Sequence, residues 1–152
     1  MSNRKVVTKV REFNRFYMPK MKLLGNNYLG SEYSAAEARV FFEIYENEGC
    51  NAAHIAKVMN IDKSYLSKII AGYEKEGYIE RISSTKDRRS YNLYLTQKGK
   101  NKAEELIRKS EEEIEMIIKG LSNEDRLSIE KALDTVMELL RKGECNNENS
   151  TV

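Results

Sequence analysis

Hydrophobic residues recur through much of the chain at intervals of three and four, the spacing that places them on one face of a helix. One such stripe covers residues 6–24 and contains Pro19, which has no N–H to donate, so we expect the helix to kink or break there. Two more stripes cover residues 97–120 and 122–143. The pattern therefore predicts three long amphipathic helices, one at the start of the sequence and two at its end.

Between these long helices, capping residues divide the chain into shorter helical segments. Ser34 and Glu37, three residues apart, form a capping box, which predicts a helix over about 35–48. Asn51 and Asp62 are each suited to cap a further short helix, the second over about 63–76. Asn60 lies between these two helices and tolerates the left-handed backbone that a tight interhelical turn needs.

Two segments after the short helices, 78–83 and 91–96, are rich in β-branched and aromatic residues and predict a β-hairpin. The connection over 84–90 is polar, basic and too long for a two-residue turn, so we expect it to project from the body. Two short helices joined by a tight turn and followed by such a hairpin make a winged helix-turn-helix. The expected fold is therefore mainly α with a small β-hairpin wing (α+β), flanked by long terminal helices.

Composition agrees with this picture, and the charge distribution adds a function class. The 152 residues suit one domain, and a single proline with eight glycines favours a helical protein. The net charge of +2 is unevenly spread, since residues 1–22 carry +6 and 57–100 carry +5, whereas 23–56 carry −4 and 101–152 carry −5. Such a chain can turn a cationic face toward a polyanion, although ordinary solvated helix faces are the alternative.

Candidate chemistry other than binding is sparse. Cys50 and Cys145 are too few for a disulfide framework or a zinc site, and His54 has no partners at the spacing of a catalytic or metal site. The carboxylates over 111–113 point in different directions from a helix, which is typical of a solvated face. No apolar run is long enough for a membrane span. We therefore expect a cytoplasmic protein with no membrane association, cofactor or metal, and not an enzyme.

The second short helix carries hydroxyl, phenol and ammonium groups near its N-terminal end, where they can meet base edges and phosphates of DNA. Arg88 and Arg89, at the tip of the hairpin, suit the negative potential of a minor groove. We therefore expect the protein to bind double-stranded DNA. The helix residues concerned are Lys63, Ser64, Tyr65, Ser67 and Lys68.

Three stretches of the sequence resemble the MarR family of regulators, and the resemblance covers about residues 6–142. In that family the wing places an arginine in the minor groove, which implies this role for Arg89, with Asp87 helping to hold the tip. Asn60 and Tyr73 stand where many members have glycine and leucine, and neither departure threatens the fold. The three stretches are residues 55–70, residues 73–81, and the wing signature Asp87-Arg88-Arg89 leading to residues 93–99.

The start of the chain also resembles those MarR proteins whose regulator domain is fused to an acetyltransferase. The 152 residues leave no room for an acetyltransferase, so we do not expect its activity. With the resemblance included, the residues expected to contact DNA are Asn51, Lys63, Ser64, Tyr65, Ser67, Lys68, Lys86, Asp87, Arg88 and Arg89.

The expected domain organisation follows from these elements. We expect a MarR-type winged helix-turn-helix domain over 1–143, with its DNA-binding part over about 51–100 and its dimerisation part over about 1–30 and 101–143. Residues 144–152 are expected to form a disordered tail. The apolar stripes of the terminal helices need a second copy to cover them, and a homodimer with recognition helices about 34 Å apart implies a roughly palindromic operator.

Four aromatic residues leave two interpretations open: they belong to the core, or they line a cleft in which MarR-like proteins often hold small phenolic or lipophilic effectors. Cys50 is a poor candidate for a redox switch because nearby glutamates oppose its thiolate. The predicted function is a sequence-specific DNA-binding transcriptional regulator, a repressor or an activator, that a small molecule releases from its operator or modulates. The alternatives are a winged-helix protein-interaction module without specific DNA binding and, less favoured, a small enzyme. The four aromatic residues are Phe13, Tyr17, Phe41 and Tyr45.

Overall fold

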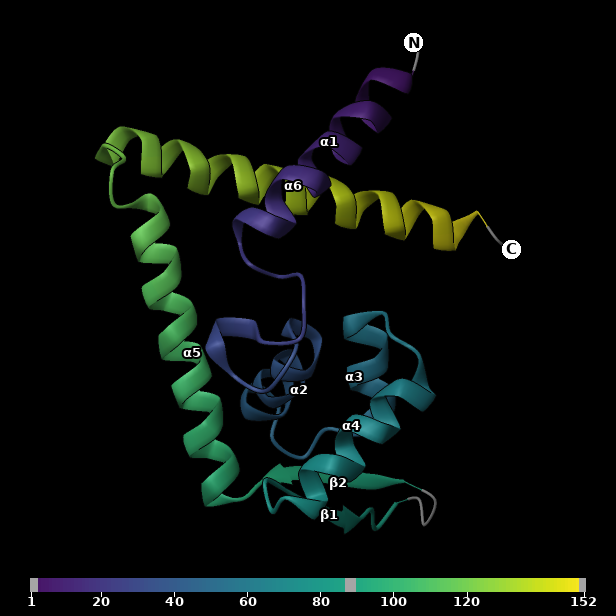
Figure 1. Cartoon of the computed structure of the whole chain (residues 1–152). Coiled ribbons are helices and arrows are strands. Elements are labelled where there is room, and N and C mark those ends of the chain that lie inside the picture. The colour runs from purple at the N-terminus through teal and green to yellow at the C-terminus, as the bar shows by residue number, and fades with distance from the viewer. Residues whose placement is uncertain (1–2, 87–89, 151–152) are drawn as a thin grey trace. The chain divides into compact units, whose positions relative to one another are not determined.

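The computed structural model of the chain describes residues 3–86 and 90–150 and has six α-helices, one 3-10 helix and two strands within them. The chain divides into two compact units, residues 1–112 and residues 113–152. The elements, shown in Figure 1, are α1 (Arg4–Lys20), η1 (Tyr28–Gly30), α2 (Ala35–Glu46), α3 (Ala52–Met59), α4 (Lys63–Lys75), β1 (Ile79–Ser83), β2 (Tyr91–Leu95), α5 (Gln97–Ile118) and α6 (Asn123–Asn149). This is the winged helix-turn-helix fold that the sequence predicted, with long helices before and after it.

The short helices begin where the capping residues predicted. Ser34 Oγ accepts a hydrogen bond from the Glu37 N–H while the Glu37 carboxylate accepts one from the Ser34 N–H, which completes the capping box of α2. Asn51 and Asp62 cap α3 and α4 in the same manner through their side-chain oxygens. Asn60, between α3 and α4, has the left-handed backbone (φ 51°, ψ 50°) that the turn was expected to need. These local predictions are confirmed.

The two strands form an antiparallel hairpin whose register runs from Ile79 opposite Leu95 to Ser83 opposite Tyr91. The free edge of β2 is extended by the connection between α2 and α3. There the Gly49 N–H donates to the Leu93 carbonyl (2.9 Å), and the Leu93 N–H donates to the Cys50 carbonyl (2.8 Å). The segment of two residues at positions 49–50 therefore bonds to β2 as a third strand would.

An aromatic cluster forms the centre of the winged-helix core. Phe41 of α2 is fully buried and stacks on Tyr73 of α4, with ring centroids 4.2 Å apart. Tyr33 and Tyr78 meet the Phe41 ring edge-on, with centroids 5.5 and 5.3 Å away. Such ring pairs contribute about 0.5–1.5 kcal/mol each beyond the area they bury. Tyr73, at a position where many MarR proteins have leucine, is thus a core residue.

The start of the chain differs from its predicted form. The apolar stripe was expected to run on one helix to Leu24, but α1 ends at Lys20. Pro19 lies in the last turn, where its missing N–H removes a helical hydrogen bond, and Lys22 then takes a left-handed backbone (φ 54°). The helix thus ends one residue after Pro19, and the left-handed Lys22, with the Leu23 N–H donating to the Met18 carbonyl (2.9 Å), closes it. None of the described α1 residues is buried.

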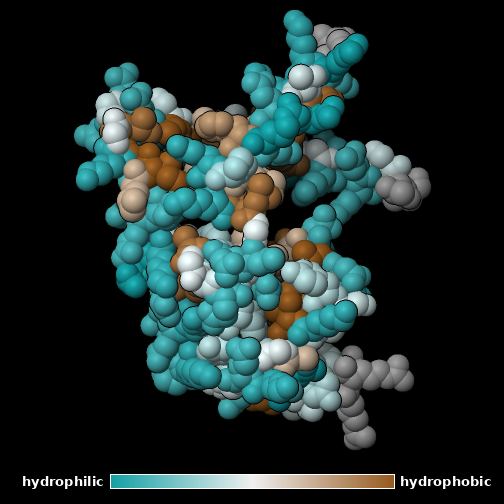
Figure 2. Space-filling model, in the orientation of Figure 1, coloured by the Kyte–Doolittle hydropathy of each residue, from teal (hydrophilic) through white to brown (hydrophobic). Residues whose placement is uncertain are grey.

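The end of the chain differs as well. A helix end near Gly143 was predicted, with a disordered tail after it, but α6 continues through Gly143 to Asn149, so residues 144–149 are helical. Good helix formers precede Gly143 over residues 139–142, and one glycine costs only roughly 1 kcal/mol, so it does not have to end the helix. Like α1, α6 has no buried residue, and Figure 2 shows hydrophobic surface, in brown, over its first half. Within residues 3–86 and 90–150, no helix has the length and apolar character needed to cross a bilayer.

Candidate nucleic-acid interface

Helix α4 separates its apolar residues from its polar ones. Leu66, Ile69, Ile70 and Tyr73 are buried in the core. The opposite face is exposed, and it consists of the five residues that the sequence predicted there: Lys63, Ser64, Tyr65, Ser67 and Lys68. Because burial of one face fixes the rotation of the helix, the sequence pattern placed this polar face correctly.

The chemistry of this face suits a nucleic acid. Two ammonium groups can pair with phosphates, two serine hydroxyls can donate or accept, and Tyr65 presents a phenol that is 42% exposed. Asp62 Oδ2 accepts a hydrogen bond from the Tyr65 N–H (3.2 Å), which fixes the first turn. The exposed face thus combines groups for both base edges and phosphates.

The far end of α4 is held by neighbouring elements. The Tyr73 hydroxyl donates to the Glu37 carbonyl of α2 (2.7 Å). An ion pair of 2.8 Å joins Arg81 of β1 to Glu74 of α4. These contacts attach the helix to both α2 and the hairpin, so its exposed face has a defined position on the winged-helix core.

Of the other residues predicted to contact DNA, the structure describes Lys86 and Asn51. Lys86 is exposed on the wing, and its N–H donates to Ser84 Oγ (3.3 Å). Asp87, Arg88 and Arg89 lie outside the described residues. Asn51 is half-buried, and its side-chain oxygen is already used to accept from the His54 N–H (2.8 Å).

A concave pocket of about 670 Å³ lies between the end of α1, α2, the end of α3 and α5. Of the four aromatic residues predicted to bind an effector, the structure places only Phe41 in its wall. Phe13 and Tyr17 stack on each other along α1 (centroids 5.0 Å apart), and the Tyr45 hydroxyl donates to Glu104 (3.2 Å). Tyr28 and Phe42, two other aromatic residues that the sequence offered for such a cleft, also line the pocket, whereas sequence reasoning missed Met18, Leu23, Met59 and Ile107.

No signal in the sequence could have assembled this wall, because its residues come from five separate segments. Stripes identify which face of one helix is apolar, but not which helices meet. Arg39 also lines the pocket, and its guanidinium pairs with the buried Glu43 carboxylate (2.6 Å). The pocket wall is therefore mainly apolar, with Arg39, Ser110 and Glu111 as its polar residues, and a mainly apolar wall with a few polar groups is usual for a small-molecule site.

Two further predictions concern reactive groups. Burial, and then the Glu43 carboxylate, raises the pKa of the Cys50 thiol. The sequence predicted that Glu46 and Glu48 would oppose a thiolate at Cys50; the direction agrees, but the main cause is burial and the contributing carboxylate is that of Glu43. Among the described residues, no three His, Cys, Asp or Glu side chains cluster so that they could hold a metal ion.

The fold and this exposed helix face define the chain as a winged helix-turn-helix protein. Residues 33–91 match the family model of the MarR family. The similar curated proteins include an HTH-type transcriptional regulator of Bacillus subtilis, YybA, at 27% identity over 93 residues, which are 61% of this chain and 62% of that protein. They also include BilQ of Clostridioides difficile, at 30% identity over 69 residues, 44% of this chain and 47% of that protein. Over residues 33–91 the chain is therefore similar to the MarR family.

Solved structures agree on the fold. A mutant MarR from E. coli complexed with operator DNA superposes with a TM-score of 0.70 at 21% identity, covering 90% of this chain and 98% of that one. The match to the curated relatives is shorter, since the aligned part spans about half to three-fifths of their length.

Proposed function

We propose that the chain is a transcriptional regulator that binds double-stranded DNA in a sequence-specific manner, with α4 in the major groove and the wing beside it. The observation that carries this proposal is the exposed face of α4, where Lys63, Lys68 and Tyr65 stand out from a helix whose other face is buried. The named relatives are transcriptional regulators, and the matched structure of the mutant MarR holds operator DNA, which supports the proposal. Repression is the mode we favour.

The test compares two kinds of contact on an operator selected from a random pool of duplexes and on an unrelated duplex. Tyr65→Ala combined with Ser67→Ala should weaken operator binding by about 1–3 kcal/mol for each base contact that the change removes, and random binding much less. Arg89→Ala should weaken both by comparable factors and lower the salt slope by about one unit. Arg108→Ala on α5, whose side chain pairs with Glu112, is the control and should leave both affinities unchanged.

The outcomes separate DNA binding from protein docking. If neither variant changed affinity for either duplex, α4 and the wing would not touch DNA. The exposed face of α4 would then have to be a docking surface for another protein, which is the alternative function. No catalytic role is part of the proposal, and a cytoplasmic location is the one we assign to a regulator of this kind.

We also propose that the protein works as a homodimer on a palindromic operator. Apolar residues are exposed on α1 and, independently, on α6, where Leu133 is 39% and Leu140 60% exposed. A monomer would leave both stripes in water, so a second copy is the partner that a two-fold axis supplies.

The pocket beside Phe41 is the site that we propose for a small phenolic or lipophilic effector. Its mainly apolar wall suits an aromatic ring, and Arg39 can attract an acidic group. A compound bound there should change operator affinity, which titration of the operator complex with a panel of aromatic acids and phenols measures.

A further inference from the structure

A short closed loop, residues 27–33, follows the end of α1, and we call it the strap. Its ends are joined because the Tyr28 N–H donates to the Tyr33 carbonyl (2.6 Å). Ser31 is buried inside it, with its hydroxyl donating to the Tyr28 carbonyl (2.6 Å) and accepting from the Tyr33 N–H (3.1 Å). The strap is therefore a compact unit whose two ends move together.

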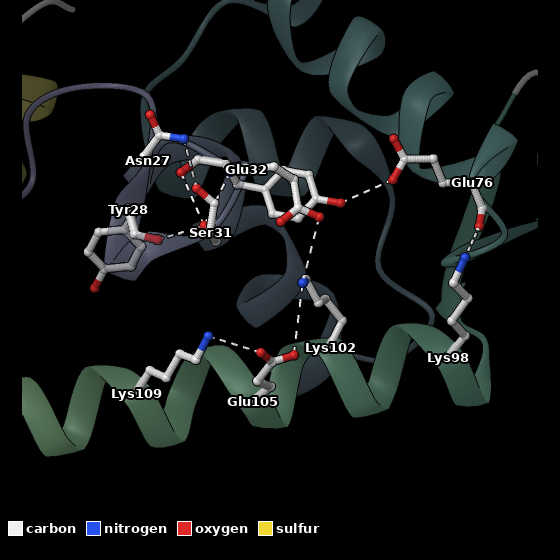
Figure 3. Close-up of polar contacts among 10 residues, drawn as sticks. Asn27, Tyr28, Ser31, Glu32, Glu76, Lys98, Lys102, Glu105 and Lys109 are labelled. Carbon is white, nitrogen blue, oxygen red and sulfur yellow. Dashed lines mark hydrogen bonds and ion pairs between the residues drawn. The ribbon is translucent and has the colours of Figure 1, made fainter.

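The two ends of the strap contact two different sites. Tyr28 is part of the wall of the apolar pocket. Tyr33, at the other end, donates its hydroxyl proton to Glu76 Oε2 (3.0 Å), and Glu76 is the C-cap residue of α4. Figure 3 shows Tyr28 and Glu76 on opposite sides of this network. One hydrogen-bonded loop thus connects the pocket to the end of the recognition helix.

Helix α5 holds the strap and Glu76 from one side. Lys98 Nζ donates to the Glu76 carbonyl (2.7 Å), and Lys102 Nζ lies 3.6 Å from the Glu32 carboxylate and 3.8 Å from Glu105 (Figure 3). The Lys102 side chain is 18% exposed but that of Glu32 is 60% exposed, so solvent screens this ion pair much as it screens a surface pair. These contacts link the strap and the end of α4 to α5.

The strap contains a strained residue. Leu29 has a left-handed backbone (φ 55°, ψ 32°), which is unfavourable for a leucine and is held here by the hydrogen bonds on both sides. Opening of the loop would release that strain. The strap is therefore closed by hydrogen bonds, and the strain at Leu29 favours its opening.

We propose that the strap couples the apolar pocket to the recognition helix, with Tyr33 as the positioning residue. When the pocket is empty, the strap is closed and Tyr33 holds Glu76, so α4 is set for DNA. A compound that displaces Tyr28 opens the strap, breaks the Tyr33–Glu76 bond and lowers operator affinity. The Tyr33 hydroxyl stays a donor throughout, since burial, Tyr78 and Glu76 raise its pKa. This inference rests on the proposed DNA binding and on the proposed effector pocket.

The experiment measures the dissociation constant of an operator duplex carrying a red fluorophore, with and without 8-anilinonaphthalene-1-sulfonate, an aromatic acid that serves as the pocket probe. The probe should weaken operator binding by the wild type about fivefold or more, and the operator should weaken probe binding by the same factor. Tyr33→Phe should weaken operator binding about threefold to tenfold without the probe, as loss of one hydrogen bond to a charged group would, and should abolish most of the probe's effect.

Glu76 provides an independent test, because its side chain is exposed and its replacement leaves the core intact. Glu76→Ala should reproduce the Tyr33→Phe phenotype, and the double variant should be no worse than either single one. Glu76→Gln keeps an acceptor oxygen and should restore near-normal affinity and probe response. Lys100→Met, which breaks the Lys100–Glu48 pair on α5, is the control and should behave as the wild type.

Three results would overturn the inference and leave the proposed DNA binding in place. One is a Tyr33→Phe protein with wild-type operator affinity and wild-type probe response. The other is a wild type that binds the probe with unchanged operator affinity. Additive effects of Tyr33→Phe and Glu76→Ala would show that Tyr33 does not act through Glu76. By contrast, a wild type that does not prefer the operator over random duplex would overturn the proposed function itself.

Discussion

The winged-helix region buries its apolar side chains within the chain, whereas the two terminal helices, α1 and α6, leave theirs exposed. In the winged helix, Phe41, Ile44, Ile55, Leu66 and Leu93 are at most 2% exposed, so this core is complete within one chain. The terminal helices α1 and α6 have stripes of similar residue types and bury none of them. The difference shows that the same amphipathic pattern can be buried within the chain or left exposed on it.

The largest expected effect comes from placing charge on the stripe of α6. In Leu133→Asp combined with Val136→Asp, a dimer would bury four carboxylates, two from each chain, at a cost of at least about 2 kcal/mol each. We expect monomers and loss of operator binding, measured by sedimentation equilibrium at micromolar concentration. The control, Asp134→Asn, lies off the stripe on α6 and should remain dimeric. A wild type that sediments as a monomer would contradict the proposed dimer.

Phe41→Ala tests the other side of the comparison. Removal of this fully buried ring should lower the free energy of unfolding by about 3–5 kcal/mol, because the cavity left between Tyr33, Tyr73 and Tyr78 cannot close. Thermal unfolding followed by circular dichroism measures this. Phe13→Ala is the comparison, since Phe13 is 43% exposed in one chain. If Phe13→Ala cost as much as Phe41→Ala, the α1 stripe would be as fully buried in the assembled protein as the core.

Gly99→Ala tests the close contact between the first turn of α5 and the backbone of Tyr78, which precedes β1. A Cβ at Gly99 would lie 2.1 Å from the Tyr78 carbonyl oxygen, so backbone would have to move. We expect a loss of about 1–3 kcal/mol in the free energy of unfolding, typical of overpacking. Gly120→Ala is the control, because no atom lies within 4 Å of a Cβ there. Equal stabilities of the two variants would mean that the backbone at Tyr78 can move away from the new Cβ with no loss in the free energy of unfolding.

The smallest effect concerns the unexpected length of α6. Gly143 lies inside the helix with open space around a Cβ, so Gly143→Ala should raise the stability of this helix by about 0.5–1 kcal/mol. Amide hydrogen exchange over residues 144–149 measures it and should slow. Unchanged exchange in this segment would indicate that the helix there does not depend on residue 143.

The sequence predicted those parts of the fold that are decided locally. Capping by Ser34 and Asn51, the left-handed Asn60 and the exposed face of α4 all follow from residue type and short spacing, and the structure confirms them. The strap could not be predicted, because Leu29 adopts a backbone that its own preference disfavours. Hydrogen bonds within the strap and to Glu76 determine the conformation of that segment.

The candidate sites show the same division. The five exposed residues on α4 were predicted because one helix contains them all, whereas the pocket wall combines residues from distant segments, and only Phe41 among the four predicted aromatics is in it. The Tyr33–Glu76 bond joins residues 43 positions apart and leaves no periodic signal. The exposed residues of one helix can be predicted from sequence, whereas a pocket wall between elements needs the fold.

The pairing of Gly49 and Cys50 with Leu93 has a consequence for the behaviour of the protein at high concentration. An open strand edge offers unpaired N–H and carbonyl groups to other molecules and promotes aggregation. Here the edge of β2 is already occupied at its middle, and Gly49 suits this position because its left-handed backbone (φ 86°) is strained for other residues. The edge left open, that of β1, is only five residues long and bears the charged Glu80 and Arg81. The hairpin can therefore project toward a ligand without recruiting other hairpins into a growing sheet.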